Sequence, residues 1–423
     1  MKVLVIGGGG REHALCLALA RDPAVVGLHC APGNAGIEGL AALHAVEATD
    51  PRSVADLAEG LGVDLVVVGP EAPLVAGVAD AVRARGIACF GPTAAAARLE
   101  GSKAFAKEIM AAADVPTAMA RVCDDVAAVA DALDAFGPPY VVKDDGLAAG
   151  KGVVVTTDRE AALEHAKNCA GRVLVEEYLD GPEVSVFALT DGRTIRALAP
   201  AQDFKRLGDG DSGPNTGGMG AYCPLDWAPA GLLDEVHARV LQPTIDEMRE
   251  RGTPFVGLLY AGLALTSRGM RVVEFNARFG DPETQVVLAR LRTPLGALLL
   301  AAASGTLEAA EPYSWVDGAA ITVVVAAADY PGTPRKGDVI GGLAAADAIE
   351  GVHVVHAGTA RDEAGNVVSA GGRVLCVTAT GADLYAARDR AYQGVAAIEL
   401  PGGQYRHDIA AAAAAGEIVV PGN

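Results

Sequence analysis

Residues 141–156 read VVKDDGLAAGKGVVVT, two runs rich in valine separated by a loop of small residues. The valine runs predict two short strands joined as a hairpin. A loop of this kind can fold over a polyphosphate, donate backbone N–H groups to it and exclude water. It is not a Walker A motif, because Gly152 follows Lys151 where that motif has Ser or Thr, and no helix begins there. The residues of this stretch that we expect to contact phosphate are Lys143, Gly150, Lys151 and Gly152.

Lysine is scarce in this sequence, which has eight lysines against 26 arginines in the whole chain. A sequence that places arginine on its surface keeps lysine mainly where a compact ammonium group is needed. Five of the eight lie near glycine-rich or acidic stretches in the middle of the chain: Lys103, Lys107, Lys143, Lys151 and Lys205. Lys103 and Lys205 therefore join the candidate site residues. For Lys107, a solvated helix face is an equally good explanation.

A second polar stretch, EFNARFGDPE at 274–283, directly follows an apolar run. In a strand, residues two apart share a face, so Glu274 and Asn276 point the same way, and Arg278 does so too if the strand continues. One carboxylate and one amide oxygen suit Mg²⁺, which completes its shell with phosphate and water, and Arg278 could neutralise a transferring phosphoryl group. Asp281 precedes a proline, a pair that is also typical of the start of a helix. The candidates for the base and ribose of a nucleotide are Glu176, Glu177, Leu179 and Glu183.

The first hundred residues alternate short apolar runs with helix-period segments, and helices are predicted near 11–21, 52–61 and 74–85. Continuous apolar strands between helices predict a parallel sheet covered on both faces, with ligands beyond the carboxyl ends of the strands. Gly7-Gly8-Gly9-Gly10 joins a strand to a helix, an arrangement that receives phosphate, although a tight turn alone also explains these glycines. A dinucleotide site is disfavoured, because Glu12 occupies the place of the third glycine of that fingerprint.

The alternation of strands and helices changes near residue 100, where a long helix is predicted over 102–113. Beyond it, short strands rich in Val, Ile and Phe mix with helices, which is typical of an α+β arrangement. The last hundred residues add strands and one clear helix over 382–396, and Glu311-Pro312 is a plausible boundary before them. We therefore expect three domains, at 1–101, 102–310 and 311–423.

The composition limits the classes of function. The chain has 423 residues, enough for about three domains, and carries a formal charge of −19. Such an acidic excess argues against nucleic acid as a partner, because neutralising a phosphate backbone needs clustered Lys and Arg.

Seven scattered cysteines without a CxxC pair argue against disulfides and zinc sites. Glycines directly after residues 1–6 argue against a targeting peptide, and no apolar run has the roughly 18–20 residues that a membrane span needs. We expect a cytoplasmic protein.

These motifs together resemble those of the phosphoribosylamine–glycine ligase family, a branch of the ATP-grasp ligases. The resemblance runs nearly from end to end, and PNTGGMG at 214–220 is its most specific segment. It implies an N-terminal doubly wound parallel-sheet domain, a central ATP-grasp module with a mobile lid at about 115–185, and a small, mostly β C-terminal domain. The other matching segments are GGREH at 9–13, APGNAG at 31–36, GPEAPL at 69–74, EGSK at 100–103, DGLAAGKG at 145–152, GPNTGGMGAY at 213–222, the stretch 274–285 and GGRVL at 371–375.

The resemblance also implies a reaction: a monomer joins glycine to 5-phosphoribosylamine at the expense of ATP, through glycyl phosphate, in purine biosynthesis. Its partners would be these small molecules, and Mg²⁺ or Mn²⁺ would bind Glu274 and Asn276. Catalytic roles would fall to Asp203, Lys205, Arg278 and Asp281. The residues implied for ATP are Lys103, Lys143, Gly150, Lys151, Gly152, Glu176, Glu177, Leu179 and Glu183. Those implied for the phosphoribosyl substrate are Gly9, Gly10, Arg11, Glu12, Asn34, Gly69, Pro70, Glu71, Asn215 and Gly218.

Three positions depart from the family pattern: Gly8, Asp144 and Phe204 stand where Asn or Ser, Ala, and His are usual. The last departure removes only an imidazole, since Asp203 and Lys205 remain. Two alternatives stay open, an ATP-grasp carboxylase or formyl-transferring ligase, and a non-catalytic nucleotide-binding regulator. A nicotinamide dehydrogenase already lacks the acidic residue that would bind the ribose.

Overall fold

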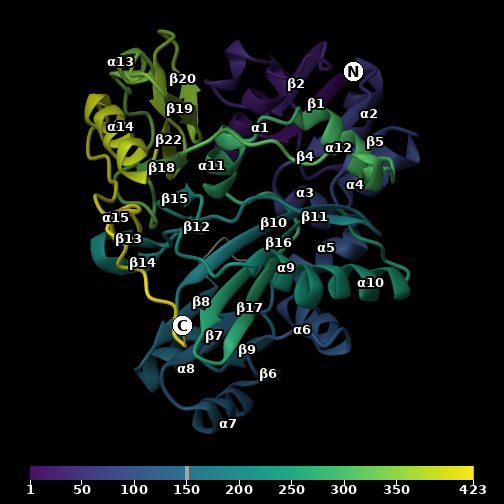
Figure 1. Ribbon diagram of the computed structural model, residues 1–423, viewed down its shortest axis with the longest axis vertical. Helices are drawn as coiled ribbons and strands as arrows, with labels where there is room; N and C mark the ends of the chain where they lie inside the picture. Colours follow the sequence, from purple (N-terminus) through teal and green to yellow (C-terminus); the bar gives the residue numbers. More distant parts are fainter. Residues whose placement is uncertain (148–151, 423) are drawn as a thin grey trace.

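The computed structural model describes residues 1–147 and 152–422. Figure 1 shows the N-terminal sheet and the sheet of β6 to β9 at opposite ends of the molecule, with β10, β16 and β17 between them. Gly150 and Lys151 lie outside the described residues. Within those residues, no helix is long and apolar enough to cross a bilayer.

The N-terminal sheet is parallel, with strand order β3-β2-β1-β4-β5. Its central strands are valine-rich and buried on both faces, as predicted for a sheet sandwiched between helices. Because β1 lies between β2 and β4, the strand order reverses at β1, and in such sheets ligands bind beyond the carboxyl ends of the strands at this point. The bounds are β1 (Lys2–Gly7), α1 (Gly10–Ala20), β2 (Gly27–Pro32), β3 (Ala42–Leu43), α2 (Pro51–Leu61), β4 (Leu65–Val68), α3 (Glu71–Ala76), α4 (Val78–Ala84), β5 (Ala88–Phe90) and α5 (Ala94–Gly101).

The prediction of one helix near 74–85 is wrong, because the chain forms two helices there. Gly77 ends α3 in the left-handed region at φ +93°, and α4 begins at the next residue. Glycine adopts this conformation at little cost, which makes it a common helix terminator. The first of the two helices begins at Glu71, directly after a glycine-rich turn.

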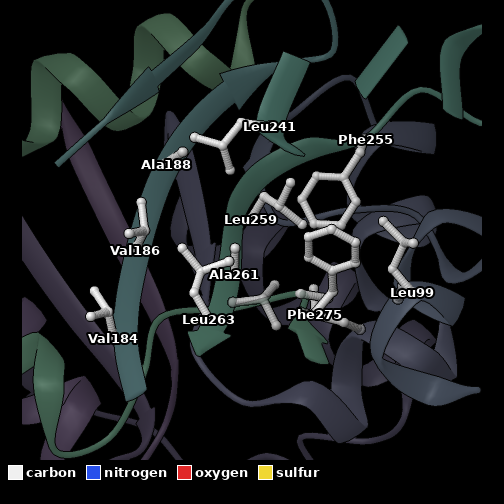
Figure 2. Close-up of a cluster of buried hydrophobic side chains, with 14 of the residues drawn as sticks. Leu99, Val184, Val186, Ala188, Leu241, Phe255, Leu259, Ala261, Leu263 and Phe275 are labelled. Atoms are coloured by element: carbon white, nitrogen blue, oxygen red, sulfur yellow. The ribbon is translucent and has the colours of Figure 1, made fainter. Parts of the chain in front are cut away.

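The central region contains two antiparallel sheets. The smaller, β6-β9-β7-β8, has a core of its own in which α7 and α8 bury aliphatic side chains. The larger, β11-β10-β16-β17, shares a core with the N-terminal domain, and Figure 2 shows how β10 and β16 contribute alternate side chains to it beside Leu99, Phe255 and Phe275. The smaller sheet and its helices are β6 (Ala120–Cys123), α7 (Val126–Phe136), β7 (Tyr140–Asp144), β8 (Val153–Thr156), α8 (Arg159–Asn168) and β9 (Val173–Glu176). The larger sheet is β10 (Glu183–Asp191), β11 (Ile195–Ala197), β16 (Val256–Thr266) and β17 (Gly269–Asn276).

The helices of the central region frame these sheets. The helix predicted over 102–113 is α6 (Lys103–Ala112), and its N-cap Ser102 accepts from the backbone N–H of Phe105 at 3.2 Å. A π-helical turn, His237–Leu241, joins the helices α9 and α10. The remaining bounds are α9 (Leu232–Val236), α10 (Gln242–Glu250), α11 (Glu283–Arg290) and α12 (Leu295–Ala303).

A third large sheet, β12-β15-β18-β22-β19, combines strands from both sides of residue 311. All eight residues of β18 are buried, between β15 on one side and β22 on the other. Helix α14 packs on β18 and β22. The bounds are β12 (Gln202–Asp203), β15 (Gly220–Cys223), β18 (Ala319–Ala326), α13 (Leu343–Asp347), β19 (Val352–His356), β22 (Arg373–Gly381), α14 (Leu384–Ala397) and α15 (Ala411–Ala414), with two small ladders, β13 (Arg206–Gly208) with β14 (Ser212–Asn215) and β20 (Thr359–Arg361) with β21 (Val367–Ser369).

Candidate active site

Lys143 lies at the point where β7 approaches β17. Its ammonium group donates to the carbonyl oxygen of Val273 at 3.1 Å and lies 2.7 Å from Glu176 Oε2. Lys107 of α6 reaches the other oxygen of Glu176 at 3.0 Å, so it is not on a solvated face. Burial disfavours all three charged forms, yet the pKa of Lys143 is raised by Glu176 and that of Glu176 is lowered by the two lysines. One buried carboxylate therefore holds two ammonium groups side by side.

Helix α6 anchors the start of the loop between β7 and β8. Lys103 Nζ donates to the carbonyl oxygen of Gly146 at 2.9 Å, and Ser102 Oγ donates to Asp145 Oδ1 at 3.0 Å. Burial lowers the pKa of Lys103, with Lys143 acting in the same direction and Glu274 against it. The predicted phosphate-binding lysines 103 and 143 are thus close enough to influence one another.

The far end of this loop is Gly152. It is buried, and its carbonyl oxygen accepts from the backbone N–H of Asp144 at 2.8 Å. This bond closes the base of the predicted hairpin. The predicted phosphate contacts of Gly150 and Lys151 fall outside the described residues.

After Glu176 the chain leaves the small sheet and enters β10 at Glu183. Glu177 Oε1 accepts from the backbone N–H of Met119 at 3.0 Å and Glu177 Oε2 from Arg268 at 2.9 Å. The side chain of Glu177 is thus engaged away from Lys143, in contrast to that of Glu176. Leu179 is half-buried in the connection.

Asp203 and Lys205 lie beside the start of β10. Lys205 forms an ion pair with Glu183, and its Nζ is 4.0 Å from Asp203 Oδ1. Burial raises the pKa of Asp203 to about 7, against the opposing effect of Lys205. This carboxyl group can therefore gain or lose a proton near neutral pH.

Glu274 and Asn276 share one face at the end of β17, as the two-residue spacing predicted. Asn276 Nδ2 lies 3.5 Å from Glu274 Oε1. Burial opposes ionisation of Glu274, but Lys205, Lys143 and Lys103 together lower its pKa. In the part of the chain that the structure describes, no group of three or more His, Cys, Asp or Glu side chains forms a metal site. The donor set here, one ionised carboxylate and one amide oxygen, fits Mg²⁺, which takes its other ligands from phosphate and water.

Arg278 connects this strand end to the N-terminal domain. Its Nε lies 3.2 Å from Glu71 Oε2, and its Nη2 lies 3.0 Å from Glu100 Oε1 and 3.5 Å from Asn276 Oδ1. Burial opposes its charge, but the two glutamates outweigh this effect and raise the pKa of Arg278. A permanent positive charge is thus fixed beside the predicted metal ligands.

Glu12 fills the space between two glycine-rich turns of the N-terminal sheet. The backbone N–H of Gly9 donates to Glu12 Oε2 at 2.6 Å, and a Cβ atom on Gly69 would lie 2.0 Å from Glu12 Oε1. Arg11 Nε lies 2.5 Å from Glu12 Oε1, and Arg11 Nη1 donates to the carbonyl oxygen of Phe279 at 3.1 Å. The predicted turns therefore meet at one buried carboxylate, next to Pro70 at the start of α3.

Asn34 fixes the backbone of two domains. Its Nδ2 donates to the carbonyl oxygens of Gly8 at 2.9 Å and His356 at 3.0 Å, and its Oδ1 accepts from the backbone N–H of Gly36 at 2.9 Å. The structure thus places this predicted substrate residue where the first and last domains meet.

Asp281 does not cap helix α11, whose N-cap is Pro282. Its Oδ1 accepts from Gln285 Nε2 at 2.9 Å, and its Oδ2 lies 3.2 Å from Arg373 Nη2. Gly218 has φ +109°, and a Cβ atom there would lie 2.5 Å from Pro282 Cδ. Gly10 lies against the same group, since its Cβ atom would be 3.4 Å from Asp281 Oδ1. Asn215 ends β14 in the separate hairpin that pairs it with Arg206.

Several polar residues of this region were not predicted. Tyr260 donates to Glu283 Oε1 at 2.8 Å, and Ser185 Oγ lies 2.8 Å from the Tyr260 hydroxyl. Tyr260 is hidden within an apolar run of the sequence, so no local signal separates it from the core. Arg373 belongs to the GGRVL segment, which was recognised as a motif without a role for its arginine.

The small sheet that carries Lys143, placed against a sheet that ends in Glu274 and Asn276 and next to a parallel α/β domain, defines an ATP-grasp enzyme. Such enzymes use ATP and a divalent metal ion. Residues 1–100 match the phosphoribosylglycinamide synthetase N domain, 101–284 its ATP-grasp (A) domain and 320–412 its C domain. The chain therefore belongs to the phosphoribosylglycinamide synthetase family.

Named relatives agree with this assignment. The chain is 69% identical to a phosphoribosylamine–glycine ligase of Streptomyces coelicolor, over 98% of this chain and all of that protein. It is 57% identical to the enzyme of that name from Mycobacterium tuberculosis, over 99% and 100%. The crystal structure of the Thermotoga maritima phosphoribosylamine–glycine ligase matches with a TM-score of 0.83 and 32% identity, over 97% of this chain and all of that one. A biotin carboxylase domain from Hydrogenobacter thermophilus shares the fold at 18% identity and a TM-score of 0.71, over 96% and 91%.

Proposed function

We propose that this chain joins glycine to 5-phosphoribosylamine at the expense of ATP, forming glycinamide ribonucleotide, ADP and phosphate, in the de novo synthesis of purines. The observation that carries the proposal is that the small sheet and the N-terminal domain both approach the end of β17. Glu274 faces Lys143 of the small sheet, Lys103 of α6 and Lys205 on one side, and Arg278 contacts the N-terminal domain on the other.

The nucleotide binds between the two antiparallel sheets. Lys103, Lys143 and Lys151 offset the charge of the triphosphate, and the backbone from Glu176 to Leu179 contacts the base, with Glu177 contributing its main chain there. Glu183 reaches the ribose. A divalent ion held by Glu274 and Asn276, Mg²⁺ or in its place Mn²⁺, supplies further neutralisation of the phosphates.

The carboxylate of glycine attacks the γ-phosphorus, so that glycyl phosphate forms and ADP leaves. Arg278 stabilises the negative charge that develops on the transferring group. The amine of phosphoribosylamine then attacks the glycyl carbonyl carbon and phosphate leaves. Asp203 accepts the amine proton, for which its pKa of about 7 is suited, and Lys205 holds Asp203 in place. Asp281 positions the ammonium group of glycine.

The phosphoribosyl group binds at the glycine-rich edge of the N-terminal domain. The phosphate lies at the turns that contain Gly9, Gly10 and Gly69 and is bound by Arg11, and Glu71 orients the ribosyl hydroxyls. Glu12, Asn34 and Pro70 fix the turns, while Gly218 and Asn215 close the far side. Residues 115–185 form a lid, an assignment that their separate core supports, and its closure protects glycyl phosphate from water. We assign the domains to 1–101, 102–310 and 311–423 of a monomer that works in the cytoplasm.

The experiment measures ADP release with Mg²⁺ and ATP, first with glycine, bicarbonate or formate alone, and then with phosphoribosylamine added to each. We expect rapid release only with glycine and the amine together, and a mass spectrum that shows glycinamide ribonucleotide. Release with bicarbonate or formate would indicate a carboxylase or formyl-transferring ligase instead. Binding of ATP without turnover in any mixture would indicate a regulator.

A further inference from the structure

A cavity of about 670 Å³ lies behind the connection between the small sheet and β10. Its walls come from the segment between α6 and β6, from Glu177, from the turn before β17 and β17 itself, and from the π-helical turn and the start of α10. The residues that line it are Ala113, Asp114, Val115, Pro116, Thr117, Met119, Glu177, Ala238, Arg239, Pro243, Arg268 and Arg271.

This cavity is separate from the proposed nucleotide site. Glu176 and Glu177 are adjacent, but Glu176 contacts Lys143 and Lys107, whereas Glu177 contacts Met119 and Arg268. Of the described residues that line the cavity, Glu177 is the one that is also assigned to the nucleotide, through its main chain, and none is a lysine or a metal ligand of the proposed active site. A ligand here would therefore occupy space that the reaction does not use.

The cavity has an excess of positive charge in a strongly acidic protein. Three guanidinium groups, those of Arg239, Arg268 and Arg271, face two carboxylates, those of Asp114 and Glu177. Arg268 pairs with Glu177 at 2.9 Å, and Arg239 pairs with Glu235 at 2.7 Å on the helix surface. No carboxylate of the described residues comes within 4.0 Å of Arg271.

The same residues provide both a charged end and an apolar wall. Arg271 is half-buried and lines the cavity beside Arg268 and Glu177. Pro116, Met119 and Pro243 also line it, and Met119 is 59% exposed, which is high for a large apolar residue. A charged group next to exposed apolar surface favours a ligand with both features.

Both chain connections to the small sheet contribute to this cavity. The first passes through Asp114, a non-glycine residue at φ +53°, and through Thr117, whose hydroxyl donates to the carbonyl oxygen of Val272 at 2.6 Å. The second is Glu177, whose backbone N–H donates to Met119 at 3.0 Å. A strained residue at such a junction is more common at functional sites than elsewhere. An occupant would contact both hinges of the small sheet at once.

We infer that this cavity binds a small organic anion, with its phosphate or carboxylate group on Arg271 and Arg268 and its apolar body against Met119 and Pro116, and that this occupant changes the affinity for the nucleotide. The inference of binding is independent of the proposed reaction. The coupling follows from the position of the cavity across both hinges, and by linkage the nucleotide changes the affinity for the anion by the same factor.

The test uses phenyl phosphate as the probe, titrated into the full-length protein that is saturated with ADP and Mg²⁺. Inorganic phosphate and phenol supply the charge alone and the apolar body alone. Arg271→Met removes the guanidinium, which donates to the carbonyl oxygen of Met270 at 3.3 Å but has no carboxylate partner among the described residues, and Arg271→Lys keeps a charge there. Arg251→Met is the matched control, since Arg251 pairs with Glu247 on the surface of the helical stretch, outside the cavity.

We expect phenyl phosphate to bind at least fivefold more tightly than either comparison compound. Arg271→Met should weaken its binding by about tenfold, as expected for loss of one hydrogen bond to a charged group, with partial recovery in Arg271→Lys and no change in Arg251→Met. Equal binding to Arg271→Met and the unmodified protein would overturn the site, and equal binding of inorganic phosphate would overturn the ligand class. ADP titrated with and without the probe should differ in affinity by about fivefold or more, and an unchanged affinity would overturn the coupling.

Discussion

Around Lys143 the molecule is held together by charge, whereas around Glu12 it is held by close approach of the backbone. On the nucleotide side, Glu176 forms ion pairs with two lysines. We expect the phosphates of a bound nucleotide to neutralise such ammonium groups in the same way. On the side of the N-terminal sheet, Gly9 and Gly69 leave only enough room for the side chain of Glu12. Charged partners can be exchanged for a ligand, but packed atoms cannot. Substitutions on the first side should therefore change ligand binding, and substitutions on the second should also change stability.

The largest effect on the rate is expected at Glu274, the carboxylate proposed to bind the metal ion. Glu274→Gln should lower glycine-dependent ADP release by about a thousandfold, because a metal ion contributes several kcal/mol to stabilising a charged transition state. Glutamine keeps the size of the side chain, although the change removes a negative charge that faces three lysines. The control is Glu164→Gln on the exposed face of α8, which should leave the rate unchanged. Near-normal turnover of Glu274→Gln would remove the metal assignment.

A crossed pair of substitutions separates the two phosphate sites. Arg11→Met should raise KM for phosphoribosylamine by about 10–100-fold and leave the affinity for ATP unchanged, because a charge-assisted hydrogen bond contributes about 1.5–3 kcal/mol. Lys143→Met should do the reverse. Steady-state kinetics with each substrate varied in turn would measure both effects. Loss of ATP affinity in Arg11→Met would mean that the two sites are interchanged.

Two glycine substitutions test the packing itself. Gly69→Ala should lower the free energy of unfolding by about 1–3 kcal/mol, because its methyl group would overlap Glu12 Oε1 and force the side chain away. Gly60→Ala is the control: Gly60 lies within α2 with no atom within 4 Å of an added Cβ, so this change should stabilise by about 0.5–1 kcal/mol. Urea unfolding measures both, and a neutral Gly69→Ala would contradict the tight fit between the turns.

A further effect concerns pH. Asp203 has a pKa of about 7 in the folded protein against 3.8 as its ordinary value, so the native state holds its proton more tightly than the unfolded state. This stabilisation is complete below pH 4 and is lost as the pH rises to about 7. Asp203→Asn should flatten that part of the curve of unfolding free energy against pH. A curve of unchanged slope in the variant would contradict the raised pKa.

The sequence predicts local features of this site better than distant ones. The shared face of Glu274 and Asn276 follows from strand alternation alone, and the hairpin that carries Lys143 follows from its valine runs. The pairing of Arg278 with Glu100 joins residues far apart in the chain, so no periodicity could predict it. The same holds for Lys107, because its contact with Glu176 depends on how α6 packs against the small sheet.

The fold shows the same limit. The parallel sheet and the three-part α/β and α+β architecture follow from the order of elements, whereas the break at Gly77 depends on one residue's backbone conformation. The assembly of β12 and β15 with β18 and β22 was also not predicted, because strands so far apart carry no sequence signal of their pairing.

That mixed sheet has a practical consequence for anyone who wishes to shorten or recombine this protein. A fragment cut at residue 310 would lose β18, which hydrogen-bonds to β15 along residues 220–223. The severed edge would offer unpaired N–H and C=O groups to any other chain, which is a common route to aggregation. The last hundred residues are thus better regarded as the closing piece of the catalytic module than as an independent appendage.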